Sequence, residues 1–255
     1  MEVVILAGGL GTRLSEETYI KPKPMVEING MPLIWHIMKT YERCEITEFI
    51  VCLGYKGAIL RDYFINYVSR FSDIEVDLRD NALKIHNKTK ENWTIKLIDT
   101  GIDTNTGGRL KKVQKYITGK TFCMTYGDGL ANIDFNDEII FHNSHGKLAT
   151  VAAVASPARF GNLKIGTNNK VQTFEEKNSN INEKINAGFF VLDIGIFNYI
   201  DGDEISFEHH TLKEMAQIGE LVAYKHDKFW KPCDTLRDLK DLELMSKQIP
   251  VPWFS

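Results

Sequence analysis

Short apolar segments that alternate with helical segments constrain the fold of this chain more than any other feature. Residues 1–7 form a brief β-branched run that stops at two glycines, as a strand buried on both faces of a parallel sheet does. Residues 32–44 instead place apolar side chains at helical spacing, with proline at an allowed first-turn position. Strand followed by helix, repeated along the chain, predicts an α/β fold with a largely parallel sheet.

The same alternation continues toward the C-terminus. We expect strands at residues 49–53, 94–98, 121–125, 149–154, 163–165, 171–174 and 188–192, and helices at 58–67, 109–117, 134–146 and 235–246. Beyond Pro157 the predicted strands shorten, which indicates a smaller sheet elaboration in the C-terminal half. Because no repeat and no long linker interrupts the chain, we predict one domain over residues 1–255.

Charge and composition restrict the ligands and the compartment. The 31 Lys and Arg against 34 Asp and Glu leave a formal charge of −3, so no basic field attracts nucleic acid or an anionic membrane. The longest apolar runs fall far short of the roughly 20 residues that a membrane helix needs. No signal peptide is evident, so we expect the cytoplasm. The four scattered cysteines predict buried free thiols rather than a zinc site or disulfides.

A glycine-rich stretch, LAGGLGTRL, follows the first predicted strand directly. At the carboxyl end of a strand in an open α/β sheet, such a loop lets backbone N–H groups approach phosphate oxygens. Thr12 adds a hydroxyl donor and Arg13 a fixed cation, which a bare turn would not need. The stretch is neither a P-loop nor the dinucleotide fingerprint, because its ending and its glycine spacing differ from theirs.

Ten residues after Arg13, Lys23 lies within the segment KPKPM. The prolines on either side restrict the backbone and present the ammonium group at a set position. Taken alone, such a segment is more often a rigid surface turn. Its meaning comes from the glycine-rich loop that precedes it.

The pair LAGGLGTRL and KPKPM resembles the signature of the sugar nucleotidyltransferases, which join a nucleoside triphosphate to a sugar 1-phosphate and release pyrophosphate. Further stretches are similar, in order and spacing, to the glucose-1-phosphate cytidylyltransferases of that family: TGGR at 106–109, YGDG at 126–129, RFG at 159–161, EK at 176–177, GFFV at 188–191 and FWKPCDTLRD at 229–238. The resemblance covers nearly the whole chain.

The resemblance implies a fold, a reaction and partners. The fold would be Rossmann-like, with a mostly parallel mixed sheet flanked by helices. Residues 1 to about 155 would form the nucleotide-binding core, and residues 156–255 the acceptor-binding and oligomerisation part of a homo-oligomer. The reaction would transfer a cytidylyl group from CTP to α-D-glucose 1-phosphate with Mg²⁺ as cofactor, giving CDP-glucose and pyrophosphate.

The resemblance also implies the site residues. The catalytic residues would be Arg13, Lys23, Asp128 and Asp234, of which Asp128 and Asp234 would hold the metal. The nucleotide would be bound by Leu6, Ala7, Gly8, Gly9, Leu10, Gly11, Thr12, Arg13, Lys23, Thr104, Thr106, Gly108, Arg109 and Asp128. The acceptor would be bound by Tyr126, Gly127, Glu176, Lys177, Asn186, Gly188 and Trp230.

Each implied role stands beside a plainer interpretation. Asp128 follows an apolar strand between two glycines, where a carboxylate can reach a metal but where turn aspartates are also common. Asp234 and Thr106 each precede a predicted helix and could be N-caps. Glu176 and Lys177 could belong to a surface charge run. Two carboxylates together with phosphate oxygens form the hard-oxygen set that Mg²⁺ prefers.

Other functions stay open at this stage. The chain departs from the cytidylyltransferase pattern at Asn178, Ala187 and Thr211, all in the half that would hold the acceptor. The first alternative is therefore the same chemistry with dTTP or UTP, or with another phosphorylated acceptor. The second is a non-catalytic nucleotide-binding regulator. The apolar tail at 250–254 could be an oligomer contact or could fold back on its own core.

Overall fold

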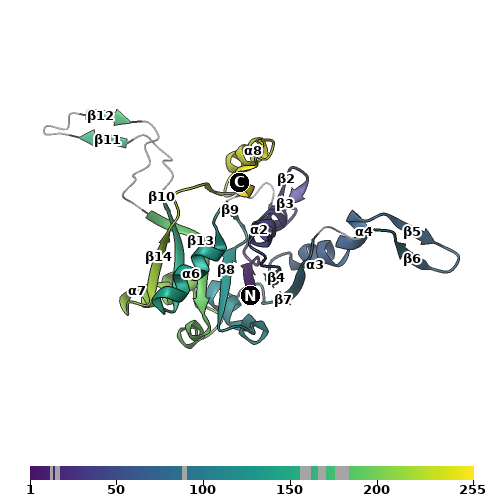
Figure 1. Ribbon diagram of the computed structural model, residues 1–255, viewed down its shortest axis with the longest axis horizontal. Coiled ribbons are helices and arrows are strands. Elements are labelled where there is room, and N and C mark those ends of the chain that lie inside the picture. Colours follow the sequence, from purple (N-terminus) through teal and green to yellow (C-terminus); the bar gives the residue numbers. More distant parts are fainter. Residues whose placement is uncertain (12–13, 15–17, 88–90, 156–161, 166–170, 176–183) are drawn as a thin grey trace.

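A seven-stranded mixed sheet forms the centre of the computed structural model, which describes residues 1–11, 14, 18–87, 91–155, 162–165, 171–175 and 184–255 (Figure 1). Its strands, in spatial order, are β14 (Leu221–Lys225), β10 (Ala149–Ala155), β13 (Lys184–Asp193), β8 (Thr121–Tyr126), β1 (Glu2–Leu6), β4 (Glu48–Leu53) and β7 (Thr94–Asp99). Only β13 runs antiparallel to its neighbours, β8 and β10. The predicted mostly parallel mixed sheet is confirmed.

Helices follow the strands as the sequence pattern predicts. They are α2 (Leu33–Glu42), α3 (Gly57–Ile65), α4 (Tyr67–Phe71), α5 (Thr106–Val113), α6 (Phe135–His145), α7 (Lys213–Gln217) and α8 (Leu236–Met245), with 3₁₀ turns at Lys23–Met25, Gln114–Tyr116, Ile194–Tyr199 and Pro252–Phe254 and a π-helical turn at Phe207–Leu212. Asp134 caps α6, accepting from the backbone N–H of Asp137, and Gly146 ends it with a φ of +64°. The helix expected at 58–67 is interrupted at Asn66.

In the described part of the chain, four two-stranded ladders lie outside the main sheet. They pair β2 (Glu27–Ile28) with β3 (Met31–Pro32), β5 (Ile74–Asp77) with β6 (Ala82–Ile85), β9 (Gly129–Ala131) with β15 (Trp230–Pro232), and β11 (Asn162–Ile165) with β12 (Val171–Glu175). The β11–β12 pair confirms the two short strands expected beyond Pro157. The β5–β6 hairpin was not predicted, and Figure 1 shows it projecting from the body beyond α4.

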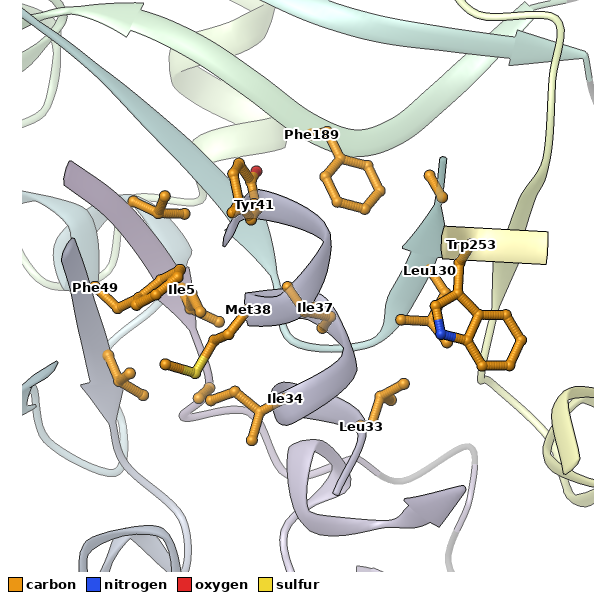
Figure 2. Packing of buried hydrophobic residues seen from close by; sticks show 14 of the residues in the cluster. Ile5, Leu33, Ile34, Ile37, Met38, Tyr41, Phe49, Leu130, Phe189 and Trp253 are labelled. Carbon is orange, nitrogen blue, oxygen red and sulfur yellow. The ribbon is translucent and has the colours of Figure 1, made fainter. Parts of the chain in front are cut away.

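Alternation along the central strands divides the core into two clusters, one on each face of the sheet. In β1, Val3 and Ile5 join one cluster while Val4 and Leu6 join the other, because successive side chains of a strand point to opposite faces. Figure 2 shows the first cluster, in which the apolar side of α2 lies against Ile5, Phe49 and Phe189. α5 and the segment from 194 to 215 cover the second face.

The C-terminal tail folds back on the chain's own core. Trp253 is fully buried, and its ring meets those of His36 and Phe229. Its indole N–H donates to His36 Nδ1 at 3.3 Å. Of the two interpretations of this tail, the structure supports packing within the chain. The helices that the structure describes are all too short or too polar to span a lipid bilayer.

Candidate active site

The glycine-rich loop is held at the carboxyl edge of the sheet by the two strands beside β1. Ala7 N–H donates to Cys52 O of β4, and Leu6 O accepts from Gly127 N–H just beyond β8. Gly8 O accepts from Tyr55 N–H. The loop therefore begins where three parallel strands end, at the edge where open α/β sheets bind ligands. Thr12 and Arg13 lie outside the described residues.

Arg109 lies buried beneath this loop. Its guanidinium donates to Gly101 O at 2.6 Å, to Ile102 O at 2.9 Å and to the Thr100 hydroxyl at 2.8 Å. Burial lowers the pKa of Arg109, but the ordinary pKa of an arginine is so high that the guanidinium still carries its charge at neutral pH. Three of its hydrogen bonds, to Gly101 O, Ile102 O and, at 3.2 Å, Leu53 O, fix the backbone around the loop. The predicted binding of the nucleotide by Arg109 stays a prediction.

Two neighbouring glycines of the loop should respond differently to alanine. A Cβ on Gly8 would lie 2.2 Å from Arg109 Nη1, whereas a Cβ on Gly9 would meet no atom of the described residues within 4 Å. We expect Gly8→Ala to destabilise the fold by about 2 kcal/mol, because the buried guanidinium must give up hydrogen bonds. Gly9→Ala, the matched control, should leave the unfolding midpoint in urea unchanged. Equal midpoints for the two variants would contradict this packing.

A short antiparallel ladder brings two distant carboxylates together. β9 begins directly after Asp128 and β15 ends two residues before Asp234, and Gly129 pairs with Pro232. Cys233 N–H donates to Asp128 O at 2.8 Å, which fixes the two segments against each other. Asp234 is not the N-cap of α8, because Thr235 caps that helix in a capping box with Asp238.

Lys23 lies between these carboxylates. Its Nζ is 2.7 Å from Asp128 Oδ2 and 2.6 Å from Asp234 Oδ1, and the residue is 8% exposed. Pro24, the next residue of its 3₁₀ turn, packs so closely on Gly127 that a Cβ there would lie 2.8 Å from Pro24 Cγ. The proline-flanked segment thus docks on the Asp128 turn, and the predicted catalytic residues that the structure describes form one cluster.

The opposite charges in this cluster stabilise one another. Burial by itself would lower the pKa of Lys23, but Asp128 and Asp234 outweigh it and raise that pKa above its ordinary value. The lysine is therefore a fixed cation at neutral pH. Asp234 is buried behind it, whereas the Asp128 side chain is 30% exposed and faces the pocket.

A pocket of about 740 Å³ lies beside this cluster. Most of the predicted nucleotide residues that the structure describes line it: Leu6, Ala7, Gly8, Gly9, Leu10, Gly11, Lys23, Thr104, Thr106, Arg109 and Asp128. Gly108 does not, because it packs against the backbone of Asp203. Thr106 is the first residue of α5, and the cap of that helix is Asn105.

On the predicted acceptor side, Tyr126, Gly127 and Asn186 line the same pocket. Gly188 lies beneath the Tyr126 ring, where a Cβ would come within 2.6 Å of it, and its φ of +83° also favours glycine. Trp230 donates its indole N–H to Ala187 O at 2.8 Å. Gly188 and Trp230 therefore support the wall. Glu176 and Lys177 lie outside the described residues.

Sequence reasoning missed Glu208, which lines the pocket from the π-helical turn. Its carboxylate accepts hydrogen bonds from the Tyr126 hydroxyl at 2.6 Å and from the Thr106 hydroxyl at 2.7 Å. These partners are 82 and 102 residues away, so no local spacing could have revealed them. The one available signal was a glutamate two residues after Ser206.

The fold and the site together define a nucleotide-handling enzyme, and comparison with known proteins gives the class. The model of the nucleotidyl transferase family matches residues 2–243, and the chain belongs to that family. Glucose-1-phosphate cytidylyltransferase of Salmonella typhimurium is 48% identical over 99% of this chain and 98% of its own. The probable glucose-1-phosphate cytidylyltransferase of Bacillus subtilis is 40% identical over 99% of both. The crystal structure of HddC from Yersinia pseudotuberculosis has a TM-score of 0.68 at 27% identity, covering 94% of this chain and 96% of that one.

Proposed function

We propose that the protein transfers a cytidylyl group from CTP to α-D-glucose 1-phosphate, giving CDP-glucose and pyrophosphate. The observation that carries the proposal is the Lys23 ammonium, fixed by Asp128 and Asp234 at the wall of a pocket that the glycine-rich loop also lines. The names of the relatives at 48% and 40% identity support the choice of nucleotide and acceptor. Because CTP is made inside cells, the proposal includes a cytoplasmic protein.

In the proposed reaction, an oxygen of the sugar 1-phosphate attacks the α-phosphorus of CTP. The new bond joins that oxygen to the α-phosphorus, and the bond from the α-phosphorus to the bridging oxygen of the β-phosphate breaks. Pyrophosphate leaves with the electron pair of the broken bond. Such a transfer needs positioning and charge stabilisation rather than a covalent enzyme intermediate. Lys23, and Arg13 by the resemblance, would offset the negative charge on the phosphoryl oxygens.

The residues present fit a divalent cation, which enzymes of this family generally use. Within the described part of the chain no three His, Cys, Asp or Glu side chains gather as a metal cluster. Two carboxylates do converge on one positive charge, however, and Mg²⁺ in nucleotide sites often takes only one or two carboxylates, with phosphate oxygens and water as its other ligands. We propose that Asp128 and Asp234 hold Mg²⁺. When bound, the ion would neutralise phosphate charge.

The acceptor half of the proposal rests on three further residues of the pocket wall. Tyr126, Gly127 and Asn186 line the pocket and would lie next to the sugar phosphate. Glu176 and Lys177 are proposed to contact that phosphate on the strength of the resemblance alone. Gly188 and Trp230 would act by shaping the wall on which these residues lie.

A matrix of nucleotides and sugar phosphates tests the proposal. CTP, dTTP, UTP, ATP and GTP are each combined with a panel of sugar 1-phosphates, and pyrophosphate release is recorded. CTP with glucose 1-phosphate should give the highest kcat/KM. A higher kcat/KM for another nucleotide and sugar 1-phosphate would identify those two as the substrates instead. Binding of nucleotides without pyrophosphate release in any combination would favour the regulator instead.

We also propose that the chain acts as a single domain and as a homo-oligomer. β13 and β14, from the acceptor half, pair within the same sheet as β1, which supports a single domain. For the oligomer, the support is the β5–β6 hairpin. Its cross-strand pairs Ile74 with Ile85 and Val76 with Leu83 share one face, and all four side chains are exposed. An isolated two-stranded hairpin is marginal in water, so a second copy would stabilise it.

The hairpin face predicts a change of mass in solution. Val76→Lys places a charge in the middle of this apolar face, and we expect it to dissociate the oligomer in light scattering. Glu75→Gln lies on the opposite face, where Glu75 pairs with Lys84, and should keep the wild-type mass. A monomeric wild type, or an unchanged mass for Val76→Lys, would count against this interface.

A further inference from the structure

We propose that Asp238 is a positioning residue for Asp234: its carboxylate holds the backbone N–H of Asp234 and so sets where the Asp234 carboxylate lies relative to Lys23 and the proposed Mg²⁺. Asp238 belongs to the first turn of α8 and was not among the predicted site residues. The inference rests on the proposed function, because that proposal makes Asp234 a metal ligand.

The capping box of α8 makes one hydrogen bond more than a cap needs. Within the box, Asp238 Oδ2 accepts from Thr235 N–H at 3.0 Å and from the Thr235 hydroxyl at 2.8 Å, and Asp238 N–H donates to the Thr235 hydroxyl oxygen at 3.2 Å. The same Oδ2 also accepts from Asp234 N–H at 3.2 Å. Asp234 precedes the N-cap, so its N–H is not one of the helical N–H groups that a cap satisfies. This extra bond acts on the backbone of Asp234 rather than on the helix.

The second oxygen of Asp238 faces the strand that leads to Asp234. Asp238 Oδ1 is 3.6 Å from Lys231 Nζ, and that ammonium group also donates to Asp241 Oδ2 at 2.9 Å. Lys231 lies in the middle of β15 and pairs with Leu130 of β9. The Asp238 side chain is only 20% exposed, so water and salt screen its contacts incompletely. Asp238 therefore contacts the chain both before and after Asp234.

These contacts act on a carboxylate that has little room to adjust. Asp234 is 7% exposed, and its Oδ1 lies 2.6 Å from Lys23 Nζ. Because the aspartate side chain is short, its carboxylate follows any shift of its backbone. Loss of a partner that orients a metal ligand typically costs about 10- to 100-fold in metal affinity or activity. Asp238 acts through a backbone N–H, so we expect an effect at the lower end of that range.

Asp238→Ala and Thr235→Ala separate this role from helix capping. Thr235→Ala removes the hydroxyl of the cap but leaves the bonds from Asp234 N–H and Thr235 N–H to Asp238. Asp238→Ala removes all of these bonds. Since both variants lose capping bonds, both should lower the midpoint of urea unfolding. Only Asp238→Ala should also raise the Mg²⁺ concentration that gives the half-maximal rate, by about tenfold.

Binding of Mn²⁺ gives a second readout, which does not depend on turnover. Mn²⁺ takes the same oxygen ligands as Mg²⁺, and its free form is measured by electron paramagnetic resonance in solutions of protein and CTP without sugar phosphate. CTP alone corrects for metal held by the nucleotide. Asp238→Ala should weaken Mn²⁺ binding about tenfold, and Thr235→Ala should bind it as wild type does. Asp238→Asn keeps an oxygen that can accept from Asp234 N–H, so it should stay within about threefold of wild type.

The outcomes separate this inference from the proposed function. If the wild-type protein adds no Mn²⁺ binding to that of CTP alone, the proposed metal site fails and this inference fails with it. If the wild type binds Mn²⁺ and Asp238→Ala binds it equally well, the inference alone is overturned. Equal losses in Asp238→Ala and Thr235→Ala would also overturn it, because the helix cap would then be the cause. So would equal losses in Asp238→Ala and Asp238→Asn, because charge rather than the hydrogen bond would then be responsible.

Discussion

Replacing Lys23 with methionine is expected to lower kcat by about a thousandfold while changing the nucleotide Kd by no more than a few fold. Removal of one preorganised charge-stabilising donor typically costs 10²- to 10³-fold in kcat. The Lys23 ammonium also holds Asp128 and Asp234 together, so its loss leaves two carboxylates facing each other beside incoming phosphates. The effect should therefore lie at the upper end of that range.

Lys21→Met is the matched control for this measurement. Lys21 lies two residues away and its side chain pairs with Glu27 at 3.1 Å, away from the cluster. The Lys21→Met variant removes the same charge as Lys23→Met and should retain the wild-type kcat. Single-turnover kinetics and nucleotide titration, done on both variants, separate turnover from binding. Near-normal turnover of Lys23→Met would rule out the proposed role, whatever its effect on binding.

The second large effect concerns stability and lies far from the pocket. Glu138 of α6 is fully buried, and neither of its carboxylate oxygens has a hydrogen-bond partner among the described residues. Burial raises the pKa of Glu138 to about 8. The titratable groups that act on it across the packing are Tyr41, Cys123 and Tyr224, none of which supplies a positive charge. Glu138 is thus an acid kept neutral in the fold.

The sign of its pH dependence follows from that raised pKa. The unfolded carboxyl loses its proton near pH 4.5, and the folded one near pH 8. Below about pH 4.5, Glu138 is protonated in both states and does not reduce the free energy of unfolding through ionisation. Between about pH 4.5 and pH 8 the reduction grows, and above about pH 8 it is constant. At pH 7 the cost is about 3 kcal/mol. We expect Glu138→Met to raise the free energy of unfolding by about that amount.

Denaturant unfolding between pH 5 and pH 9 measures this effect. The difference between Glu138→Met and wild type should widen as the pH rises to 8 and then stay constant. Glu138→Gln cannot ionise but keeps an unsatisfied polar group, so it should show the same pH trend with a smaller gain. Parallel stability curves for wild type and Glu138→Met would show that Glu138 is ionised in the fold, contrary to its burial.

The main sheet could be predicted from sequence because each of its early strands is a short apolar run bounded by turn residues. The β5–β6 hairpin was missed, although its signal was present: Ile74 and Val76 alternate with acidic residues, and Leu83 and Ile85 repeat the pattern after a polar turn. The capping box of Thr235 and Asp238 was also readable, and it would have shown that Asp234 is not the cap of α8.

The candidate site could be predicted only in part. The resemblance supplied Lys23, Asp128 and Asp234. No spacing in the sequence indicates that these two aspartates, which follow Lys23 by 105 and 211 positions, would both bind its ammonium group. Arg109 was expected to bind the nucleotide, and its bonds to backbone carbonyls depend on loops that only the fold brings together. Glu208 was missed for the same reason, since tertiary pairing alone gives it partners.

The fate of the α-phosphate tests the central claim most directly. The wild-type protein is incubated with glucose 1-phosphate and CTP carrying a label on either the α- or the γ-phosphate, in the presence of Mg²⁺. We predict that the α-label appears in CDP-glucose and the γ-label in pyrophosphate, with neither product formed when the sugar phosphate is omitted. Release of the γ-label as inorganic phosphate, or absence of the α-label from any sugar nucleotide, would contradict cytidylyl transfer.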